Sequence, residues 1–377
     1  MPPFSQDALQ LAPAFDQQEK QFANAFAIIR QAIEQRAFPG ASLAVTHRGA
    51  LVASQGFGRF TYKQGSPAVA AETVFDLASL TKVVAATTIA MLLYQRAKLS
   101  LDQPVEKTLP EFITLTPKHQ HLQRHFVTMR MLLAHSSGLP AYEKLFQIAK
   151  APGDVVRAAL TSPLVAPPGT RVEYSDIGFI LLGEALTRIA GVPLDEFAQR
   201  EIFAPLGMTR TCFNPPAEWK MEIPPTEDEG SFFGRVMQGE VNDENTNVMG
   251  GVAGHAGVFA SATNVARFAE CMLRSGSPIL HPGTLKLFMK RELSPPRTTR
   301  ALGWDTPSRP ESSSGKLFSE RSIGHLGFTG TSLWIDPARQ LSVTLLTNRT
   351  WPDRTSHAIR EVRPQVHDAI VEALNEK

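Results

Sequence analysis

The sequence predicts an α+β protein in which an antiparallel sheet, built from both ends of the chain, is flanked by terminal helices and interrupted by a mostly helical region. Strand-like runs occur near the two ends, at residues 41–57 and 323–347. Helical patterns and long loops rich in Pro and Gly fill most of the stretch between them. The 377 residues, 43% of them hydrophobic and 20% charged, are enough for one large domain or two closely packed ones.

The N-terminal third contains a helix, a hairpin and an apolar helix. Phe22, Phe26, Ile29 and Ile33 recur at helical spacing, which predicts an amphipathic helix over residues 15–35. Two β-rich runs, 41–46 and 50–57, are joined by a short turn and predict a hairpin. The next expected helix, 79–95, is apolar nearly all round, as is typical of a core helix.

The rest of the chain alternates helices with long loops and ends in strands and a helix. Residues 215–251 are expected to form a long irregular loop, and such loops are often functional. The C-terminal strands are expected at 323–326, 332–335 and 341–347, with a turn containing Pro337 between the last two. Further helices are expected near 128–134, 153–161, 176–190, 194–203, 263–274, 282–290 and 355–374.

This order predicts two parts. Residues 15–78 and 255–377 are expected to form the sheet domain, and residues 79–254 the inserted helical domain. Active sites are common in the groove between two such parts, so we expect the site there.

Bulk properties exclude several classes of partner. The formal charge of +2 gives no basic face for nucleic acid or an acidic membrane. The longest apolar run, 83–93, is too short to span a bilayer, and the N-terminus shows no signal-peptide pattern. The compartment stays open: we expect a cytoplasmic protein from the sequence as written, and a periplasmic or extracellular one if a leader was removed. Cys212 and Cys271 suggest no disulfide framework, and whether they pair stays open, as does the oligomeric state.

The first chemical signal is Ser79-Leu80-Thr81-Lys82 at the head of the apolar helix. Residues three apart share a helix face, so the Lys82 amine can reach the Ser79 hydroxyl. Burial among apolar neighbours is expected to lower the pKa of the amine and so favour its neutral form. Ser79 can equally be a helix N-cap, and Ser313-Ser314-Gly315-Lys316 shows the same spacing in a Ser/Gly loop.

Two further segments carry candidate site residues. Tyr174-Ser175-Asp176 precedes an apolar helix, and a phenol beside an ammonium can relay protons. Alternatively, Asp176 is only the N-cap and Tyr174 a core residue. His325-Leu326-Gly327 leads into a strand, where a glycine lets a substrate approach closely. A buried histidine and a bulge glycine are the structural alternative.

Taken in order, these segments resemble the S-x-x-K, Y-x-N and K-T-G motifs of the penicillin-recognising, serine β-lactamase-like superfamily. The tyrosine version is similar to class C β-lactamases and their esterase and DD-peptidase relatives. The resemblance covers roughly residues 20–350 and includes Phe38-Pro39-Gly40-Ala41, residues 132–140 and Pro168-Gly169-Thr170. It implies the β-lactamase/transpeptidase-like fold for this chain.

The resemblance also implies roles. Ser79 would be the acylated nucleophile, Lys82 and Tyr174 would handle protons, and Asp176 would occupy the asparagine position. His325 and Gly327 would lie on the K-T-G strand, and the N–H groups of Ser79 and Phe328 would form the oxyanion hole. No cofactor is needed for this chemistry.

Two departures from the motifs narrow the expected activity. His325 replaces a lysine and is mostly neutral at pH 7, which weakens the grip on a substrate carboxylate. Asp176 replaces an asparagine, and its carboxylate would favour a charged Lys82. Both changes argue against efficient β-lactam hydrolysis, and histidine at that position is known among esterases and peptidases of the family.

Two histidine-containing segments remain. The glycine-rich run 250–257 presents His255 and resembles a branch containing a muramyl-L-alanine amidase and a weak penicillin-binding carboxypeptidase; His255 in a purely structural connector is equally open. His119, His121 and His125 are interpreted as a polar surface loop, because no metal-binding spacing accompanies them.

These features predict a serine hydrolase that acts through an acyl-enzyme on a small ester or amide, or on a peptidoglycan fragment. The chain has no G-x-S-x-G elbow, which removes the usual α/β-hydrolase alternative. A penicillin-binding or sensor module with negligible turnover is the competing interpretation, and a degenerate structural relative is the third.

Overall fold

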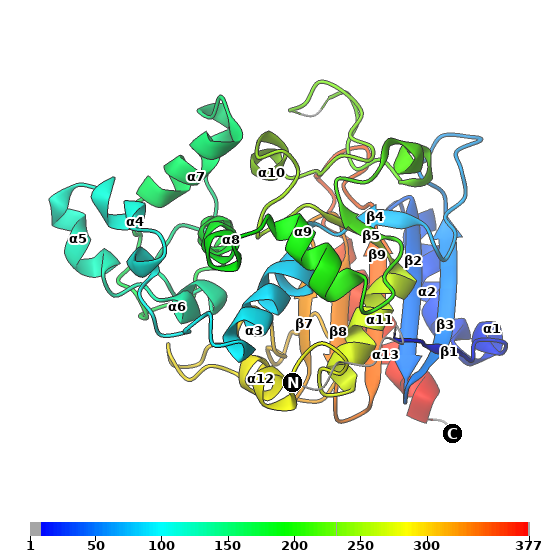
Figure 1. The fold of residues 1–377 in the computed structure, drawn as a ribbon. Helices are drawn as coiled ribbons and strands as arrows, with labels where there is room; N and C mark the ends of the chain where they lie inside the picture. The colour runs from blue at the N-terminus through cyan, green and yellow to red at the C-terminus, as the bar shows by residue number, and fades with distance from the viewer. Residues whose placement is uncertain (1–8, 231, 376–377) are drawn as a thin grey trace.

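The computed structural model describes residues 9–230 and 232–375, and Figure 1 shows a sheet region beside a largely helical region. Residues 1–8, which belong to the N-terminus that shows no signal-peptide pattern, lie outside this description. The predicted α+β class is confirmed. The proposed boundary of the two domains stays a prediction.

Six strands form the main sheet, in the order β1-β3-β2-β9-β8-β7. The N-terminal hairpin meets the C-terminal strands where β2 pairs antiparallel with β9, from Ala41 opposite Thr347 to His47 opposite Leu341. The prediction of a sheet built from both ends of the chain is therefore confirmed. The strands are β1 Ala12–Pro13, β2 Gly40–His47, β3 Ala50–Gly58, β7 Ile323–Leu326, β8 Ser332–Asp336 and β9 Leu341–Thr347.

One strand departs from the antiparallel prediction. β1 pairs parallel with β3, so the sheet is mixed. With two residues, one of them Pro13, β1 is too short to leave an alternating pattern in the sequence. The predicted turn between β8 and β9 is present, and the Asp336 carboxylate fixes it by accepting from the backbone of Ala338 and Arg339.

Helices pack on the sheet. α2 (Ala23–Glu34) and α13 (Ile359–Asn375) contact each other and share a core with the sheet that includes Phe26, Val366 and Trp334. α11 (Ala262–Leu273) contacts β2, β8 and β9 and belongs to the larger core. The helix expected over 15–35 is interrupted at Phe22, whose buried backbone leaves the helical region between α1 (Gln18–Gln21) and α2.

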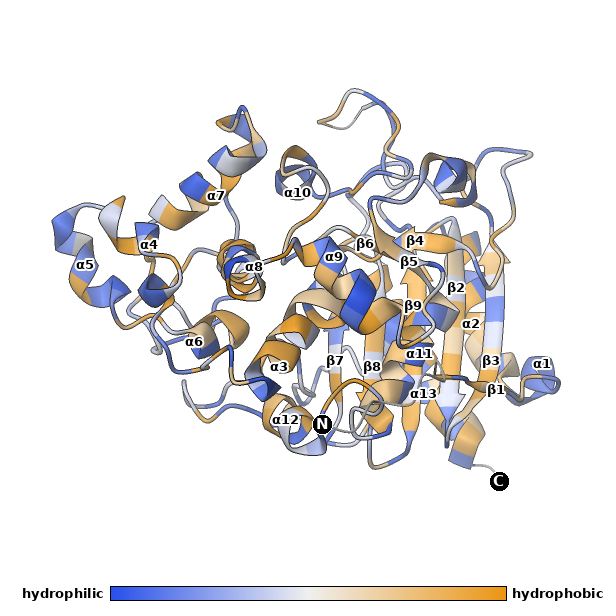
Figure 2. Cartoon of the chain, viewed as in Figure 1, coloured by the Kyte–Doolittle hydropathy of each residue, from blue (hydrophilic) through white to orange (hydrophobic). Residues whose placement is uncertain are grey.

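The core helix is continuous from Ala78 to Gln95 and combines η1 (Ala78–Leu80), η2 (Lys82–Thr87) and α3 (Thr88–Gln95). It is long and apolar enough to cross a membrane, but 83% of it is buried within the protein, as is usual for a core helix. Figure 2 shows α3 in hydrophobic colours, whereas α5 (Lys118–Arg124) is largely hydrophilic.

The remaining helices follow the predicted pattern, with short additions. The loop expected over 215–251 contains two short helices, η6 (Ala217–Glu222) and α10 (Glu244–Val248). The others are η3 Val105–Lys107, α4 Glu111–Thr114, α6 Met129–Leu133, η4 Leu145–Gln147, α7 Pro152–Thr161, α8 Asp176–Ala190, α9 Leu194–Ala198, η5 Gln199–Phe203 and α12 Pro282–Met289.

A second, three-stranded sheet was not predicted. Its order is β4-β6-β5, with β4 Val74–Asp76, β5 Thr211–Phe213 and β6 Val258–Ser261. These runs of three or four residues are too short for a periodic signal. Their pairing places the segment before Ser79 beside the segment after His255, and the Leu77 N–H donates to the Val258 carbonyl at 2.9 Å.

Two glycines set how closely α8 approaches the glycine-rich run that precedes β6. A Cβ on Gly254 would lie 2.3 Å from the Phe179 carbonyl oxygen, and one on Gly183 would lie 2.8 Å from the Gly254 nitrogen. Both contacts are with backbone, which cannot easily move aside. The glycines therefore allow α8 and the His255 segment to meet.

We predict that Gly254→Ala destabilises the protein by about 1–3 kcal/mol, the usual cost of overpacking. Gly283→Ala is the matched control, because a Cβ there meets nothing within 4 Å. In the first turn of α12 the control should be neutral or stabilising by up to about 1 kcal/mol. Denaturant unfolding of both variants measures the difference in stability. Equal stabilities would contradict the inference that Gly254 is needed for the close approach of α8 and the His255 segment.

Candidate active site

A strained turn presents Ser79. Ala78, directly before it, has φ of 47°, a left-handed conformation that costs a non-glycine residue about 1–2 kcal/mol. The buried Asp76 carboxylate holds the turn by accepting from the Ala78 N–H at 2.8 Å and from the Asn242 N–H at 2.7 Å. Burial raises the pKa of Asp76 to about 6. The turn leaves Ser79 half-buried at the head of the core helix.

Lys82 is fully buried and is surrounded by oxygen atoms. Its Nζ donates to Ser79 Oγ at 2.9 Å and to the His255 carbonyl at 3.1 Å, and it lies 2.7 Å from Asp176 Oδ1. Burial by itself lowers the pKa of Lys82, but the charges of Asp176 and Tyr174 outweigh it and leave the pKa raised. The expectation of a neutral amine is therefore wrong, and the expected effect of the Asp176 carboxylate prevails.

Tyr174 lies against Lys82 and Ser79. Lys82 Nζ is 4.9 Å from the centre of its ring, and Tyr174 and Ser79 line the same pocket. Burial raises the pKa of Tyr174, whereas Lys82 lowers it, and the net shift is upward. The ring also packs against His135, with centroids 4.6 Å apart. Tyr174 thus lines the same pocket as Ser79 rather than lying in the core away from it.

The N-cap of α8 is Ser175, not Asp176. Ser175 Oγ accepts from the Gly178 N–H at 2.9 Å, and the Ser175 N–H donates to His135 Nδ1 at 3.0 Å. With the cap supplied by its neighbour, the Asp176 carboxylate in the first turn is directed to Lys82. The alternative interpretation of Asp176 as the N-cap is therefore wrong.

His325 is buried on β7, and its ring centre lies 5.8 Å from that of Tyr174. Nδ1 lies 2.8 Å from the Leu326 carbonyl, which can only accept, so Nδ1 carries the proton and Nε2 has the lone pair. Among the described residues Nε2 has no hydrogen-bond partner. Burial, together with the charges of Lys82 and Arg300, holds the pKa of His325 well below its ordinary value, so the ring is neutral.

Gly327 is required by packing inside the protein. A Cβ there would lie 1.9 Å from Thr331 Oγ1 and 2.5 Å from the Leu77 carbonyl. Arg363 Nη2 donates to the Gly327 carbonyl at 3.1 Å. Because the N–H of a trans peptide points opposite to its C=O, this contact turns the Phe328 N–H away from Arg363. Thr331 Oγ1 donates to the Leu77 carbonyl at 2.9 Å and so ties this strand end to the Ser79 turn.

The His255 side chain is held inside the protein. Its Nε2 lies 2.8 Å from Asp243 Oδ1 and 3.0 Å from Thr246 Oγ1. Although burial raises the pKa of Asp243, the adjacent His255 and Thr246 hold it below its usual range. The backbone carbonyl of His255 is the part that contacts Lys82. Both interpretations of His255 thus hold in part: it is internally hydrogen-bonded, and it lines the site.

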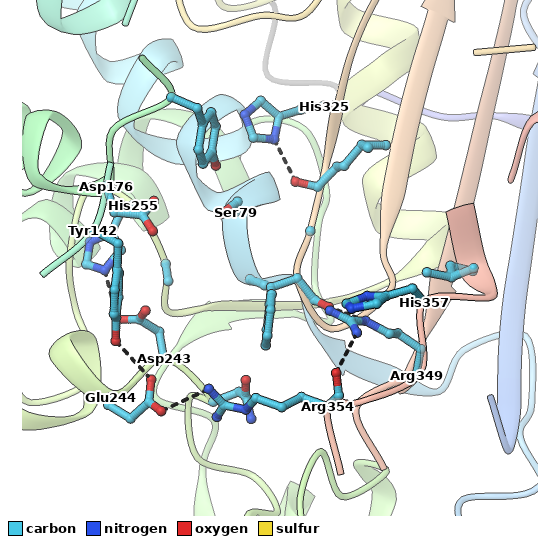
Figure 3. Close-up of a pocket in the computed structure, with 18 of the residues that line it drawn as sticks. Ser79, Tyr142, Asp176, Asp243, Glu244, His255, His325, Arg349, Arg354 and His357 are labelled. Carbon is cyan, nitrogen blue, oxygen red and sulfur yellow. Dashed lines mark hydrogen bonds and ion pairs between the residues drawn. The ribbon is translucent and has the colours of Figure 1, made fainter. Parts of the chain in front are cut away.

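A cavity of about 810 Å³ is lined by several of these residues, namely Ser79, Tyr174, Asp176, His255, His325, Gly327 and Phe328. In the close-up of Figure 3, Tyr142, Asp243 and Glu244 lie on one side of the pocket, and Arg349 and His357 on the other. Phe328 is 46% exposed, and its ring lies under the guanidinium groups of Arg349 and Arg354, at 4.5 and 5.3 Å. The apolar wall includes Tyr142, Phe146 and Phe232, and the cationic wall includes Arg349, Arg354, Arg360 and Arg363.

Much of the cationic wall is uncompensated. Arg354 forms salt bridges with Glu227 and Glu244. Within the described part of the chain, Arg349, Arg360 and Arg363 form none. Burial and the charges of the other two arginines lower the pKa of Arg363 to about 9. The buried Arg349 and Arg363 donate to backbone carbonyls instead, which leaves their positive charge without a counter-ion. Because such a charge is costly to bury, this wall is suited to an anion.

The sequence analysis missed several of these residues. Asp76 lies three residues before Ser79, and only its position could have drawn attention to it. His135, in the left-handed region at φ of 55°, left no signal beyond its place in residues 132–140. Four arginines between positions 349 and 363 were visible as a cluster. Their meeting with Phe328 depends on the fold.

The other candidates lie outside the pocket. Cys212 and Cys271 are free thiols. Part of the His119–His125 segment forms α5 rather than a loop, and no metal-binding group of side chains occurs among the described residues. Ser313-Ser314-Gly315-Lys316 lies in a loop held against α13, where Asp368 accepts from the Lys316 N–H at 2.7 Å.

A family profile described as Beta-lactamase matches residues 25–365. Two bacterial relatives extend the comparison. An N-acetylmuramyl-L-alanine amidase of Bacillus subtilis is 33% identical, over 83% of this chain and 77% of the relative. A putative D-alanyl-D-alanine carboxypeptidase of Escherichia coli is 31% identical, over 74% and 69%. The chain belongs to the beta-lactamase family and is a serine hydrolase.

Solved structures agree on the fold. EstCE1, a hydrolase with promiscuous acyltransferase activity, superposes with a TM-score of 0.73 at 22% identity, covering 94% of this chain and 99% of that one. A class C beta lactamase from Rhodobacter sphaeroides gives 0.69 at 20% identity, covering 93% and 99%. At such identities the likeness describes architecture alone, and it confirms the predicted β-lactamase/transpeptidase-like fold.

We predict that Asp176→Asn destabilises the protein by about 2–4 kcal/mol, less than a wholly buried pair because the Asp176 side chain is 19% exposed. The reason is that Lys82 would lose its counter-ion. Since the pair raises the Lys82 pKa, its stabilisation is full below the unfolded-state pKa of about 10.5 and is lost at higher pH.

Unfolding measured from pH 7 to 11 tests this, with Glu184→Gln as the control. Glu184 lies on the same helix but pairs with Arg188 at the surface, so its loss should cost less than about 0.5 kcal/mol. A cost for Asp176→Asn no greater than the control would show that the pair is not stabilising.

Proposed function

We propose that Ser79 is acylated by an amide or ester substrate and is then released by water. The observation that supports this most directly is that the Lys82 ammonium donates to the Ser79 hydroxyl at 2.9 Å and lies 4.9 Å from the centre of the Tyr174 ring. Ser79 and Tyr174 line one pocket. A hydroxyl nucleophile needs a neighbouring base and a rigid orientation, and these contacts provide both.

Tyr174, rather than Lys82, is the proposed base. Lys82 is held as an ammonium by Asp176 and donates to Ser79 Oγ, so it has no lone pair for the Ser79 proton. Tyr174 acts as a phenolate, after losing its own proton to solvent, and takes the Ser79 proton as Oγ bonds to the substrate carbonyl carbon. The bond from this carbon to the leaving group then breaks, and Tyr174 passes the proton to the leaving nitrogen or oxygen.

Deacylation uses the same groups in reverse. Tyr174 takes a proton from water, whose oxygen attacks the acyl carbon. The bond from Ser79 Oγ to that carbon breaks, and Tyr174 returns the proton to Oγ, which releases a carboxylic acid. The N–H groups of Ser79 and Phe328 are the proposed donors to the oxyanion, and such donors typically contribute a few kcal/mol of transition-state stabilisation.

Peptidoglycan-derived amides that carry a carboxylate are the proposed substrates. The names of the two bacterial relatives, an amidase and a carboxypeptidase, favour this class. Arg349, Arg360 and Arg363, which form no salt bridge within the described part of the chain, suit an anionic group. The apolar wall suits an apolar group. Neutral His325 offers no fixed cation on β7, so we expect weak β-lactam hydrolysis.

The first test is acylation. Ser79→Ala should abolish hydrolysis of p-nitrophenyl acetate and labelling by a fluorophosphonate, because the acceptor oxygen is gone. In the wild type, mass spectrometry should place the phosphonyl adduct on Ser79. An adduct elsewhere would refute the proposal, and a stable penicillin adduct without any ester turnover would favour the penicillin-binding module.

The second test concerns the cationic wall. Arg360 is exposed, so Arg360→Ala should fold normally. Its KM for N-acetylmuramyl-L-alanine should rise about tenfold, since hydrogen bonds to charged groups contribute about 1.5–3 kcal/mol. The C-terminal amide of the same substrate should be unaffected. Arg321→Ala, exposed and outside the pocket, is the control; an equal rise for both substrates would exclude carboxylate recognition by Arg360.

A further inference from the structure

If Tyr174 is the base, its phenolate places a negative charge in a buried part of the site. Burial raises the pKa of its phenol, so the phenolate needs nearby positive charge. Lys82 contributes, but its charge is shared with Asp176 at 2.7 Å. His325 is neutral. A second cation beside the phenol would add to the stabilisation that Lys82 provides.

Arg300 is placed to supply it. Its guanidinium carbon lies 5.3 Å from the centre of the Tyr174 ring, and its side chain, 17% exposed, lines the same pocket as Ser79. Burial lowers the pKa of Arg300, whereas Tyr174 raises it. The charge of Arg300 also lowers the pKa of both His135 and His325, so it acts on every ring that packs around Tyr174.

The sheet fixes this position. Residues 300–305 form a tight turn in which the Ala301 N–H donates to the Trp304 carbonyl at 2.9 Å. Asp305 then exchanges two backbone hydrogen bonds with Gly324, at 2.8 and 2.9 Å, immediately before His325. The Arg300 Nη1 donates to the Asp305 carboxylate, which holds the guanidinium in place and shares its charge, as Asp176 shares that of Lys82. The turn thus extends the sheet past β7 and places Arg300 near His325.

We propose that Arg300 is a positioning residue for acylation: its guanidinium stabilises the phenolate of Tyr174 that accepts the Ser79 proton, in place of a cation on β7. This inference rests on the proposed function. No covalent bond to Arg300 is involved, and it keeps its proton throughout. The other groups that face the phenol are Ser79, Lys82, Asp176, His135 and His325.

The test uses Arg300→Gln and Arg300→Lys with p-nitrophenyl acetate, a neutral substrate that no anion site can hold. Glutamine keeps a donor for Asp305 but removes the charge, whereas lysine keeps the charge. We expect Arg300→Gln to lower kcat by about 10- to 100-fold with little change in KM, within the range for lost electrostatic stabilisation. Lysine should restore most of the rate. Arg297→Gln, exposed in the same loop, is the control.

The pH profile separates this role from a structural one. Without the Arg300 charge the Tyr174 pKa rises, so the acidic limb of kcat/KM should move to higher pH in Arg300→Gln and return toward the wild-type position in Arg300→Lys. A uniform loss of rate at every pH that lysine does not rescue would overturn the proposal. So would an unchanged profile with full activity.

Failure of this inference can be distinguished from failure of the proposed function. If wild-type Ser79 is not labelled by fluorophosphonate, the acyl-enzyme proposal itself fails. If Ser79 is labelled, and Arg300→Gln is labelled at the wild-type rate across pH, only the role of Arg300 fails.

Discussion

The buried ion pair between Lys82 and Asp176 organises the site. Lys82 comes from the core helix and Asp176 from the start of α8, and their charges meet 2.7 Å apart below the protein surface. Removing such charges from water is costly unless each is paired and hydrogen-bonded. The Ser79 hydroxyl and the His255 carbonyl complete the set of acceptors around the ammonium. The Lys82 ammonium therefore has all its partners only when three separate segments of the chain are correctly placed.

That requirement explains features that look unrelated in the sequence. The close contact of Gly183 and Gly254 lets the His255 carbonyl reach Lys82. The small sheet β4-β6-β5 ties the segment before Ser79 to the segment after His255. Ser175 caps α8 and so leaves Asp176 available for the pair. Each of these features brings one oxygen atom close to the Lys82 ammonium.

As a chemical consequence, one group keeps a fixed positive charge while a different group accepts and returns the proton. Asp176 keeps Lys82 charged, so the amine stabilises negative charge rather than accepting a proton. The proposed proton acceptor is then the phenol of Tyr174, which lies among Lys82, neutral His325 and Arg300. Ser79, Lys82, Tyr174, Asp176 and His325 were predicted as site residues from motif order, because spacing along a helix or strand is local. The sequence predicted opposite effects of burial and of Asp176 on Lys82. It could not decide between them, since Asp176 is 94 positions away along the chain.

The fold likewise divides into features that are local in the sequence, which were predicted, and features that depend on contacts between distant residues, which were not. Long segments, such as the 79–95 helix and the longer strands of the main sheet, were predicted because each has enough apolar residues to be recognised in the sequence. β1, the three-stranded sheet and the break at Phe22 were missed, because each depends on contacts made by only a few residues. Arg300 belongs with them: the Asp305–Gly324 pairing that places it has no sequence signature.

The central claim is the charge of Lys82 in the resting enzyme. Nitrogen-15 NMR of protein labelled at lysine side chains reports it, with the Lys82 signal identified by its absence in Lys82→Met. We expect an ammonium signal from pH 6 to pH 9. A neutral amine signal at pH 7 would contradict the account and return the role of base to Lys82.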